Sequence, residues 1–248
     1  MDAMTAHPIA FTARIIRVAR TEIGAVAALM AGTLGLALFF TIAEGIVEGD
    51  QQRVDWAILN WLRPFADDPD RPIGPWWLHE ASVDITSLGG ISVLLVFALM
   101  AMGFLLMHGK KLSAVLMMAG LAGGVALSEG LKGVYDRARP PAEYQLVDTL
   151  NASFPSGHAL LATVFYLSVG VMLTRAFPRA RVKAYALIWS VVLVLLIGLT
   201  RIYLGAHWAS DVVAGWGIGA FWAMLLWLVA YAAERRQRVY MSRLKDEP

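Results

Sequence analysis

The chain has 248 residues, of which 58% are hydrophobic and only 16% charged, and its mean hydropathy is +0.59. Soluble domains are nearer a quarter charged, so this composition excludes an ordinary soluble protein. The net charge of +2 does not indicate nucleic-acid binding, and the absence of cysteine excludes disulfides, thiolate metal ligands and a cysteine nucleophile.

Apolar segments of membrane-spanning length recur along the chain. About twenty apolar residues cross ~30 Å of hydrocarbon, and each segment must be helical because lipid offers backbone groups no other partner. The sequence therefore predicts an all-α polytopic membrane protein with six spans, at residues 24–45, 85–107, 112–131, 158–176, 184–203 and 211–233. No repeat or second domain is visible, so we expect residues 1–248 to form one domain.

Three arginines precede the first apolar segment, as they do in a secretory signal. This segment is about twenty residues long, whereas the apolar core of a signal peptide has about 7–15. No convincing small-residue cleavage site follows it. We interpret it as an uncleaved first span.

Lysines and arginines are distributed unevenly between the two ends of the spans. With the amino terminus in the cytoplasm, 14 of the 21 basic residues fall in cytoplasmic segments. They are Arg14, Arg17, Arg20, Lys110, Lys111, Arg175, Arg179, Arg181, Lys183, Arg235, Arg236, Arg238, Arg243 and Lys245. The positive-inside rule then predicts that both termini are cytoplasmic.

Residues 46–84 form the longest predicted extramembrane segment. Its apolar side chains recur at the spacing of a helix that lies on the membrane surface, and they are Val54, Ile58, Trp61, Leu62 and Phe65. Its tryptophans suit the membrane interface, and they are Trp56, Trp61, Trp76 and Trp77. The segment is either a rim that guides a lipid toward a site or an ordinary interfacial loop, and the sequence does not separate these two interpretations.

Three polar clusters lie where predicted spans begin or end. The first is Lys132 with Arg139–Pro140, the second is Pro155–Ser156–Gly157–His158, and the third is Arg201 with His207 and Asp211. The predicted topology places all of them on the non-cytoplasmic face. We therefore expect residues far apart in the sequence to meet in one site.

The third cluster contains a histidine and an aspartate four residues apart. On a helix, His207 and Asp211 would share one face. The carboxylate could then fix the imidazole tautomer and leave the other ring nitrogen as a nucleophile. A pair with this spacing is also common as a purely structural contact.

The second cluster precedes a predicted span. Ser156 suits the N-cap position, and the free N–H groups of a helix start attract anions. Gly157 would let a phosphate approach the backbone, and His158 could act as a general acid. Read alone, the same residues also fit a plain turn and cap.

Lys132, Arg139 and Arg201 place fixed positive charge near the membrane boundary. Arginine can bind phosphoryl oxygens in a bidentate manner, and lysine adds a point charge. The competing interpretation is that these cations snorkel to lipid headgroups. That interpretation does not explain why they are interleaved with histidines on one face.

Together the three clusters resemble the signature of the type 2 phosphatidic acid phosphatase (PAP2) family, the lipid phosphate phosphatases. The matching pattern is Lys132, six residues, Arg139–Pro140, then Pro-Ser-Gly-His, then Arg201, five residues, His207, three residues and Asp211. The resemblance covers residues 132–211 directly, and the six-span arrangement extends it to most of the chain. One departure is Thr200, which stands where the family usually has serine and retains the hydroxyl.

The resemblance implies a metal-independent reaction without a cofactor. His207 would attack phosphorus and form a phosphohistidine, Asp211 would orient His207, and His158 would protonate the leaving group. The phosphate oxygens would be held by Lys132, Arg139, Ser156, Gly157 and Arg201. Glu129 is expected to pair with a cation of the site, with simple exposure at the membrane interface as the alternative, and Asp136 and Arg137 are expected to be solvated loop charges. His7, His79 and His108 receive no role.

The predicted activity is hydrolysis of a lipid phosphate or diphosphate at the outer face of the plasma membrane, which in a bacterium is the periplasmic face of the inner membrane. Undecaprenyl diphosphate, phosphatidylglycerophosphate and phosphatidic acid are the candidate substrates. The alternatives are phosphate transfer between lipids, a lipid transporter, and haloperoxidase chemistry on bound vanadate. The expected partners are lipids, with no nucleic acid, and the sequence predicts neither a protein partner nor an oligomeric state.

Overall fold

A computed structural model of the protein describes residues 7–65 and 67–246, without the side chains of residues 7–22, 238 and 241–246. This part of the chain is all-helical, as predicted. Its elements are α1 (His7–Glu48), α2 (Gln51–Leu62), α3 (Trp76–Ser87), α4 (Ile91–Met107), α5 (Lys111–Tyr135), the 3₁₀ turn η1 (Ala142–Tyr144), α6 (Gly157–Ala176), α7 (Ala180–Tyr203) and α8 (Ala209–Asp246). The predicted single domain of residues 1–248 also includes residues 1–6, 66 and 247–248, which lie outside the described residues.

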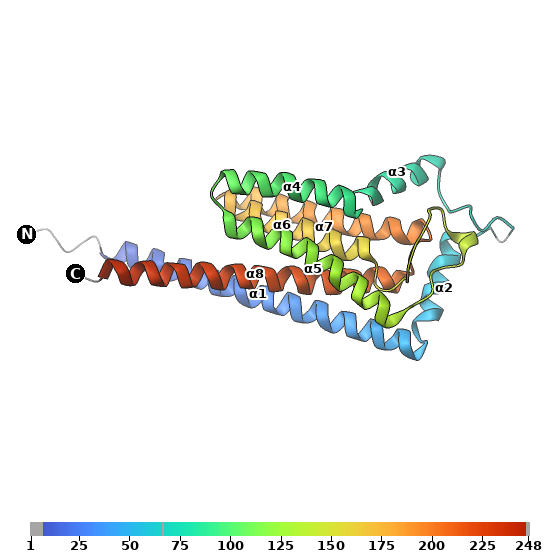
Figure 1. Ribbon diagram of the computed structural model, residues 1–248, viewed down its shortest axis with the longest axis horizontal. Coiled ribbons are helices and arrows are strands. Elements are labelled where there is room, and N and C mark those ends of the chain that lie inside the picture. Colours follow the sequence, from blue (N-terminus) through green and yellow to red (C-terminus); the bar gives the residue numbers. More distant parts are fainter. Residues whose placement is uncertain (1–6, 66, 247–248) are drawn as a thin grey trace, which may run out of the picture.

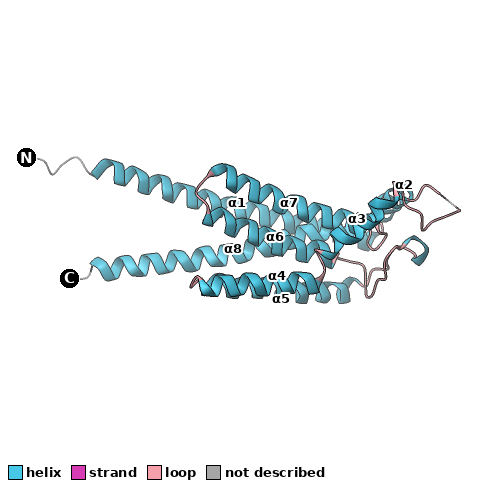
Figure 2. Cartoon of the chain, turned by 90° about the horizontal axis from the view of Figure 1, so that it is seen from above, coloured by secondary structure: helices cyan, strands magenta, loops and turns pink. Residues whose placement is uncertain are grey.

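The long helices form one elongated bundle. Helices α4 to α7 lie side by side, and the longer α1 and α8 pack along them as a pair (Figure 1). The start of α1 and the end of α8 lie at the same end of the bundle as the α4–α5 and α6–α7 turns. The other end carries α2, α3 and the segment between α5 and α6, as Figure 2 also shows. We call these the terminal end and the loop end.

Five described helices are long and apolar enough to cross a membrane. They are the segments Ile23–Glu48, Lys111–Tyr135, Gly157–Ala176, Ala180–Tyr203 and Ala209–Gln237. Each contains one predicted span, so five of the six predictions agree with the structure. The all-α, multi-pass class is therefore confirmed.

The predicted span 85–107 is not one straight helix. It comprises the end of α3 and all of α4, which meet at 49° and together would make a sixth span. The break contains Gly89, where an added Cβ would lie 2.5 Å from Ile197 Cγ2 and 3.3 Å from His158 Cδ2. The chain therefore bends where α3–α4 passes closely over α6 and α7, and this approach leaves no room for a side chain.

Helices α1 and α8 pack most closely at a pair of glycines. A Cβ on Gly35 would lie 2.5 Å from the carbonyl oxygen of Gly217, and a Cβ on Gly217 would lie 2.7 Å from that of Gly35. In lipid, such contact between backbones is a main source of helix association. These two glycines allow α8 to pack directly against α1.

The segment 46–84 contains two helices, α2 and α3. Helix α2 runs across the loop end of the bundle rather than along it (Figure 1). The predicted helical spacing is confirmed for α2. Asp55, Leu59 and Leu62 are buried, whereas Val54 and Trp61 are exposed.

Three of the four tryptophans of this segment, Trp61, Trp76 and Trp77, are exposed as an interfacial belt requires. Trp56 is different, because its ring packs against Trp208 with centroids 5.1 Å apart.

The described basic residues that were assigned to the cytoplasm lie on or next to the two turns at the terminal end and on the last part of α8. The side chains of Arg14, Arg17, Arg20, Arg238, Arg243 and Lys245 lie outside the described residues. The cytoplasmic location of both termini stays a prediction. The structure adds that the start of α1 and the end of α8 lie at the same end of the bundle (Figure 1).

Candidate active site

The three predicted clusters meet at the loop end. Lys132 lies in the last turn of α5, His158 in the first turn of α6, and Arg201 in the last turn of α7. His207 lies in the turn before α8, and Asp211 in the first turn of α8. The backbone joins two clusters directly, since Ser156 N–H donates to the carbonyl of Asp211 at 3.0 Å.

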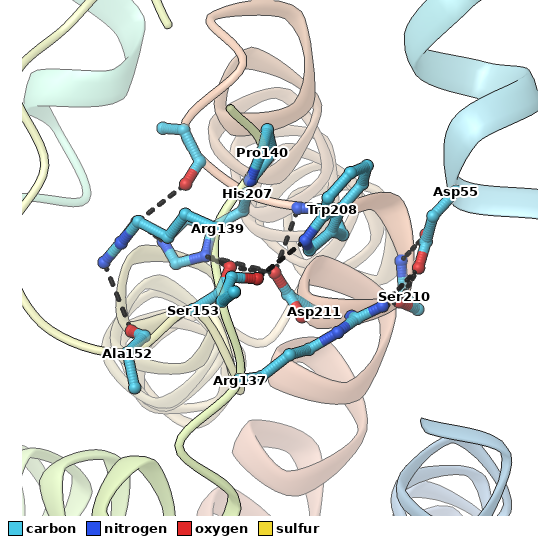
Figure 3. A network of polar contacts seen from close by, with 12 residues as sticks. Asp55, Arg137, Arg139, Pro140, Ala152, Ser153, His207, Trp208, Ser210 and Asp211 are labelled. Atoms are coloured by element: carbon cyan, nitrogen blue, oxygen red, sulfur yellow. Dashed lines mark hydrogen bonds and ion pairs between the residues drawn. The ribbon is translucent and has the colours of Figure 1, made fainter. Parts of the chain in front are cut away.

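His207 is buried, with 3% of its surface exposed, and both ring nitrogens face polar atoms. Arg139 Nη1 lies 3.2 Å from Nε2 (Figure 3). Because a guanidinium can only donate, Nε2 must carry the lone pair and Nδ1 the proton. Nδ1 lies 3.4 Å from Ser153 Oγ and 3.5 Å from Asp211 Oδ2, which accounts for this tautomer.

His207 and Asp211 were predicted to share one helical face, and this detail is wrong because His207 precedes α8. Asp211 instead acts on the turn itself: its Oδ2 accepts the N–H of Trp208 at 2.9 Å and the hydroxyl of Ser153. The carboxylate therefore caps the start of α8 while it faces His207 Nδ1.

Burial lowers the pKa of His207 to about 4, and the neighbouring Asp211 carboxylate only partly opposes this shift. Arg139 and Arg201 also disfavour a protonated ring. At neutral pH the imidazole is therefore uncharged, as a nucleophile must be.

Arg139 is held by backbone carbonyls. Its Nη1 donates to Ala206 O at 2.6 Å, its Nη2 to Leu150 O at 2.8 Å, and its Nε to Asn151 O at 3.0 Å. Burial lowers the pKa of this guanidinium, and the Asp211 and Glu129 carboxylates oppose the shift. The side chain fixes residues 150–152 beside His207 and keeps one N–H directed at Nε2.

Several buried polar atoms of the site have no hydrogen-bond partner among the described residues. They include Ser156 Oγ and Arg201 Nε. Ser156 occupies the predicted N-cap position of α6, but its hydroxyl makes no capping bond. Arg201 Nη1 donates to Thr86 Oγ1 at 3.1 Å. Buried polar groups are normally paired, so these atoms are available to an anionic ligand.

The two remaining predicted site residues to be placed are Lys132 and His158. Lys132 Nζ lies 2.7 Å from Glu129 Oε1, so the predicted pairing of Glu129 with a site cation is confirmed. His158 is half-buried and interacts electrostatically with His207 and with the three cations of the clusters. The structure thus brings together every predicted site residue, while their catalytic roles stay predictions.

Arg137 was predicted to be a solvated loop charge, and this prediction is wrong. Its Nη1 lies 2.6 Å from Asp211 Oδ1, its Nη2 lies 2.7 Å from Asp55 Oδ2, and only 11% of its side chain is exposed (Figure 3). Ser210 joins the same network, donating its hydroxyl to Asp55 Oδ2 at 2.6 Å. The segment between α5 and α6 folds back onto the turn before α8, where Trp208 Nε1 donates to Ala138 O at 2.9 Å, and this contact removes Arg137 from solvent.

Three further residues of this network were not predicted from the sequence, and they are Asp55, Ser153 and Ser210. A signal for Asp55 was present, because it lies four and seven residues before the buried Leu59 and Leu62. A carboxylate on the buried stripe of a helix needs a partner. No comparable signal marked Ser153 or Ser210. Within the described part of the chain, no group of three or more histidine, aspartate or glutamate side chains is arranged to hold a metal ion.

Comparison with known proteins connects this geometry to a family. Residues 110–235 match the sequence profile of the PAP2 superfamily. Phosphatidylglycerophosphatase B of Bacillus subtilis is 31% identical over 163 residues, which are 65% of this chain and 78% of that protein. A lipid A 1-phosphatase of Rhizobium etli is 40% identical over 32% of this chain and 30% of its own length. An undecaprenyl-diphosphatase of Sulfolobus acidocaldarius is 34% identical over 29% of this chain and 31% of its own length.

The fold also matches a solved structure, a transmembrane PAP2-type phosphatidylglycerolphosphate phosphatase from Bacillus subtilis. The TM-score is 0.70 at 28% sequence identity, and the match covers 78% of this chain and 94% of the other. The similarity therefore extends beyond the three clusters to the arrangement of the helices.

Proposed function

Because the chain belongs to the PAP2 superfamily, we propose that it is a membrane lipid phosphatase that works through a phosphohistidine on His207. The observation that carries this proposal is the state of the buried His207 ring. Its Nε2 lone pair faces Arg139, and its Nδ1 faces Asp211. The ring is thus neutral and oriented beside fixed positive charge.

In the first step Nε2 of His207 attacks phosphorus and the ester bond to the lipid breaks. The N–H of Arg139 that faces Nε2 in the free protein donates its hydrogen bond to a phosphoryl oxygen instead, and the remaining oxygens are bound by Arg201, Lys132, Ser156 and the N–H groups at the start of α6. Asp211 stabilises the positive charge that develops on the imidazole. These donors act in a buried site, where electrostatic stabilisation of a phosphoryl group is strong.

His158 supplies the proton that the departing alkoxide or phosphate needs. In the second step His158 takes a proton from water, the oxygen of that water attacks phosphorus, and the bond to Nε2 breaks. Inorganic phosphate leaves and His207 returns to its neutral state. No metal ion takes part in this scheme.

The substrate is proposed to be a lipid phosphate or diphosphate of a bacterial membrane. The names of the three relatives refer to phosphatidylglycerophosphate, to the 1-phosphate of lipid A and to undecaprenyl diphosphate. Of the predicted candidates, phosphatidylglycerophosphate is supported by the match that spans most of both chains. Undecaprenyl diphosphate and phosphatidic acid complete the set to test.

The site is proposed to face the periplasm from the inner membrane. Two observations support this orientation. The basic residues assigned to the cytoplasm concentrate on segments of the terminal end, and the site lies at the opposite, loop end (Figure 1).

The test is release of inorganic phosphate from each candidate lipid by purified protein in EDTA. We expect turnover of at least one lipid, and His207→Ala should lower it on the order of 10⁴-fold or more. His108→Ala is the matched control, because His108 is an exposed histidine at the end of α4. A wild-type protein inactive on every lipid would refute the proposed activity.

Rapid quenching at alkaline pH with ³²P-labelled substrate tests the intermediate. Label on His207 in the wild-type protein supports the phosphohistidine. Wild-type turnover without labelled protein at any quench time would argue for direct attack by water instead.

A further inference from the structure

A buried chain of three charged side chains connects the surface helix α2 to the active site. Asp55 of α2 is 2% exposed, and it accepts hydrogen bonds from Arg137 Nη2 at 2.7 Å, Ser210 N at 3.0 Å and Ser210 Oγ at 2.6 Å. Arg137 Nη1 donates to Asp211 Oδ1 at 2.6 Å. Figure 3 shows Arg137 between the two carboxylates. The order of contacts is therefore Asp55, Arg137, Asp211 and His207.

The two oxygens of Asp211 have different partners. Oδ1 is bound by Arg137, whereas Oδ2 faces His207 Nδ1 and accepts from Ser153 and Trp208. A carboxylate bound in this way on both oxygens cannot rotate. Arg137 thus holds Oδ2 in the position where it meets the ring.

The charge of Arg137 also has a cost for the reaction. An isolated Arg137–Asp211 pair would be neutral overall, so the carboxylate would give little support to a cationic imidazole. Asp55 supplies a second negative charge on the far side of Arg137. The three side chains together carry a net charge of −1, and all of it is buried, where charge acts strongly.

We propose that Asp55 and Arg137 are positioning residues for the reaction: Arg137 fixes the Asp211 carboxylate against His207, and Asp55 offsets the charge of Arg137. Helix α2 is then part of the catalytic apparatus, and not only a surface element beside it. This inference rests on the proposed function for its kinetic test.

Isosteric variants separate charge from structure. Asp55→Asn makes the three side chains neutral overall and should lower kcat on the order of 10²-fold. Arg137→Gln removes the clamp and leaves two carboxylates. Asp55→Asn combined with Arg137→Gln restores the net charge of −1 and should recover at least about tenfold in kcat over Asp55→Asn alone.

The recovery is the deciding result, because a purely structural network would lose more with each broken bond. A double variant no more active than Asp55→Asn, with thermal unfolding showing that both are folded, overturns the proposal. Asp84→Asn is the control, since Asp84 is an exposed carboxylate on α3.

A second readout does not need turnover, so it decides the inference even if the wild-type protein hydrolyses none of the lipids. In ¹⁵N-histidine spectra, the pKa of His207 should rise in Arg137→Gln, fall in Asp55→Asn, and return toward the wild-type value in the double variant. Shifts of the same sign in the two single variants would contradict the charge argument.

A separate observation concerns Ser128 on α5. Its hydroxyl is buried, with 2% of the residue exposed, and finds no hydrogen-bond partner among the described residues. Serines inside helices commonly donate to the carbonyl four residues earlier, as Ser168 and Ser190 do here. An unpaired buried hydroxyl is costly, so a ligand is the natural partner.

Ser128 Oγ lies next to the predicted phosphate position. A Cβ built on Gly157 would lie 3.2 Å from this oxygen and 3.8 Å from Lys132 Nζ. The hydroxyl and the ammonium therefore flank the start of α6, where free N–H groups attract an anion. We infer that Ser128 donates a hydrogen bond to a phosphoryl oxygen of the substrate.

The test uses orthovanadate, whose binding by ⁵¹V NMR does not require turnover, together with kcat/KM for the lipid. Ser128→Ala should weaken vanadate binding and lower kcat/KM, each about tenfold or more. Ser190→Ala is the control, because Ser190 is also buried but its hydroxyl is bonded to its own helix. Unchanged vanadate affinity in Ser128→Ala overturns this assignment, whether or not the wild-type protein hydrolyses the lipids.

Discussion

The two ends of the bundle differ in how deeply their charged side chains are buried. At the loop end, Arg201 and Asp211 are buried with 7% and 0% of their surface exposed, and the charged groups around them share hydrogen bonds. At the terminal end, Arg175 and Glu234 form a pair whose side chains are 38% and 42% exposed. This pair lies at a cavity of about 840 Å³ with mostly apolar lining residues.

This difference in burial indicates which end of the bundle carries the catalytic groups. Removing a charged side chain from water costs several kcal/mol, and an ion pair does not always recover that cost. The burial of Asp55, Arg201 and Asp211 at one end of a membrane bundle is therefore explained better by catalysis than by stability. The Arg175–Glu234 pair at the terminal end stays in contact with solvent, so it does not carry the free-energy cost of removing charge from water.

Asp211→Asn is expected to have the largest effect. The amide can still cap α8, but it cannot stabilise the cationic imidazole, so kcat should fall on the order of 10⁴-fold. Phosphate release from the preferred lipid measures this loss, and circular dichroism checks that the fold is retained. A loss below tenfold would remove Asp211 from the mechanism.

An arginine-to-lysine exchange at each end compares the two regions directly. Arg201→Lys keeps the charge but loses the planar donor pair, and kcat/KM should fall on the order of 10²- to 10³-fold. Arg175→Lys should leave kcat/KM unchanged within about twofold, because Arg175 lies at the terminal end. Equal losses in both variants would contradict the functional division between the ends.

The protonation of His207 gives a prediction with a definite sign. Burial lowers its pKa to about 4 from the usual 6.5, so the folded state binds fewer protons than the unfolded state. The contribution of His207 to the free energy of unfolding should therefore decrease as pH falls from about 6.5 to about 4. A ¹⁵N-histidine titration measures the midpoint, and a value at or above 6.5 would contradict the buried, neutral ring.

The smallest predicted effects concern stability. Arg63 is 4% exposed and donates to the carbonyls of Tyr144 and Tyr203, so Arg63→Ala should lower the free energy of unfolding by about 1–3 kcal/mol. Arg175→Gln should change it by less than about 1 kcal/mol, because it breaks an exposed pair. Denaturant titration in mixed micelles provides both values, and a reversed order would mean that burial does not set the strength of these contacts.

The sequence was sufficient for much of the fold and for most of the site. Five spans could be located because apolar runs of fixed length have one stable conformation in lipid. His158, His207 and Asp211 could be named because the family pattern specifies residue types at fixed spacing. The bend between α3 and α4 could not be predicted, because it depends on Gly89 passing against Ile197 and His158 in other helices.

The burial of Arg137 could not be predicted from the sequence. Its position in a polar loop indicated solvation, but residues 136–156 fold back onto the start of α8 and the turn before it. The bonds from Ser156 N to Asp211 O at 3.0 Å and from Trp208 Nε1 to Ala138 O at 2.9 Å show this contact. Asp55 lies 82 residues from Arg137, too far for any local pattern to connect them.

Hydropathy and residue spacing were enough to predict a membrane bundle that carries the PAP2 pattern at one end, because both can be read from short stretches of the chain. The pairing of the charged groups depends on how the helices pack. The tautomer of His207, the burial of Arg137 and the entry of α2 into the site all follow from contacts between distant segments. Those contacts exist only when the helices have packed, because packing removes water and makes each charged group depend on its neighbours.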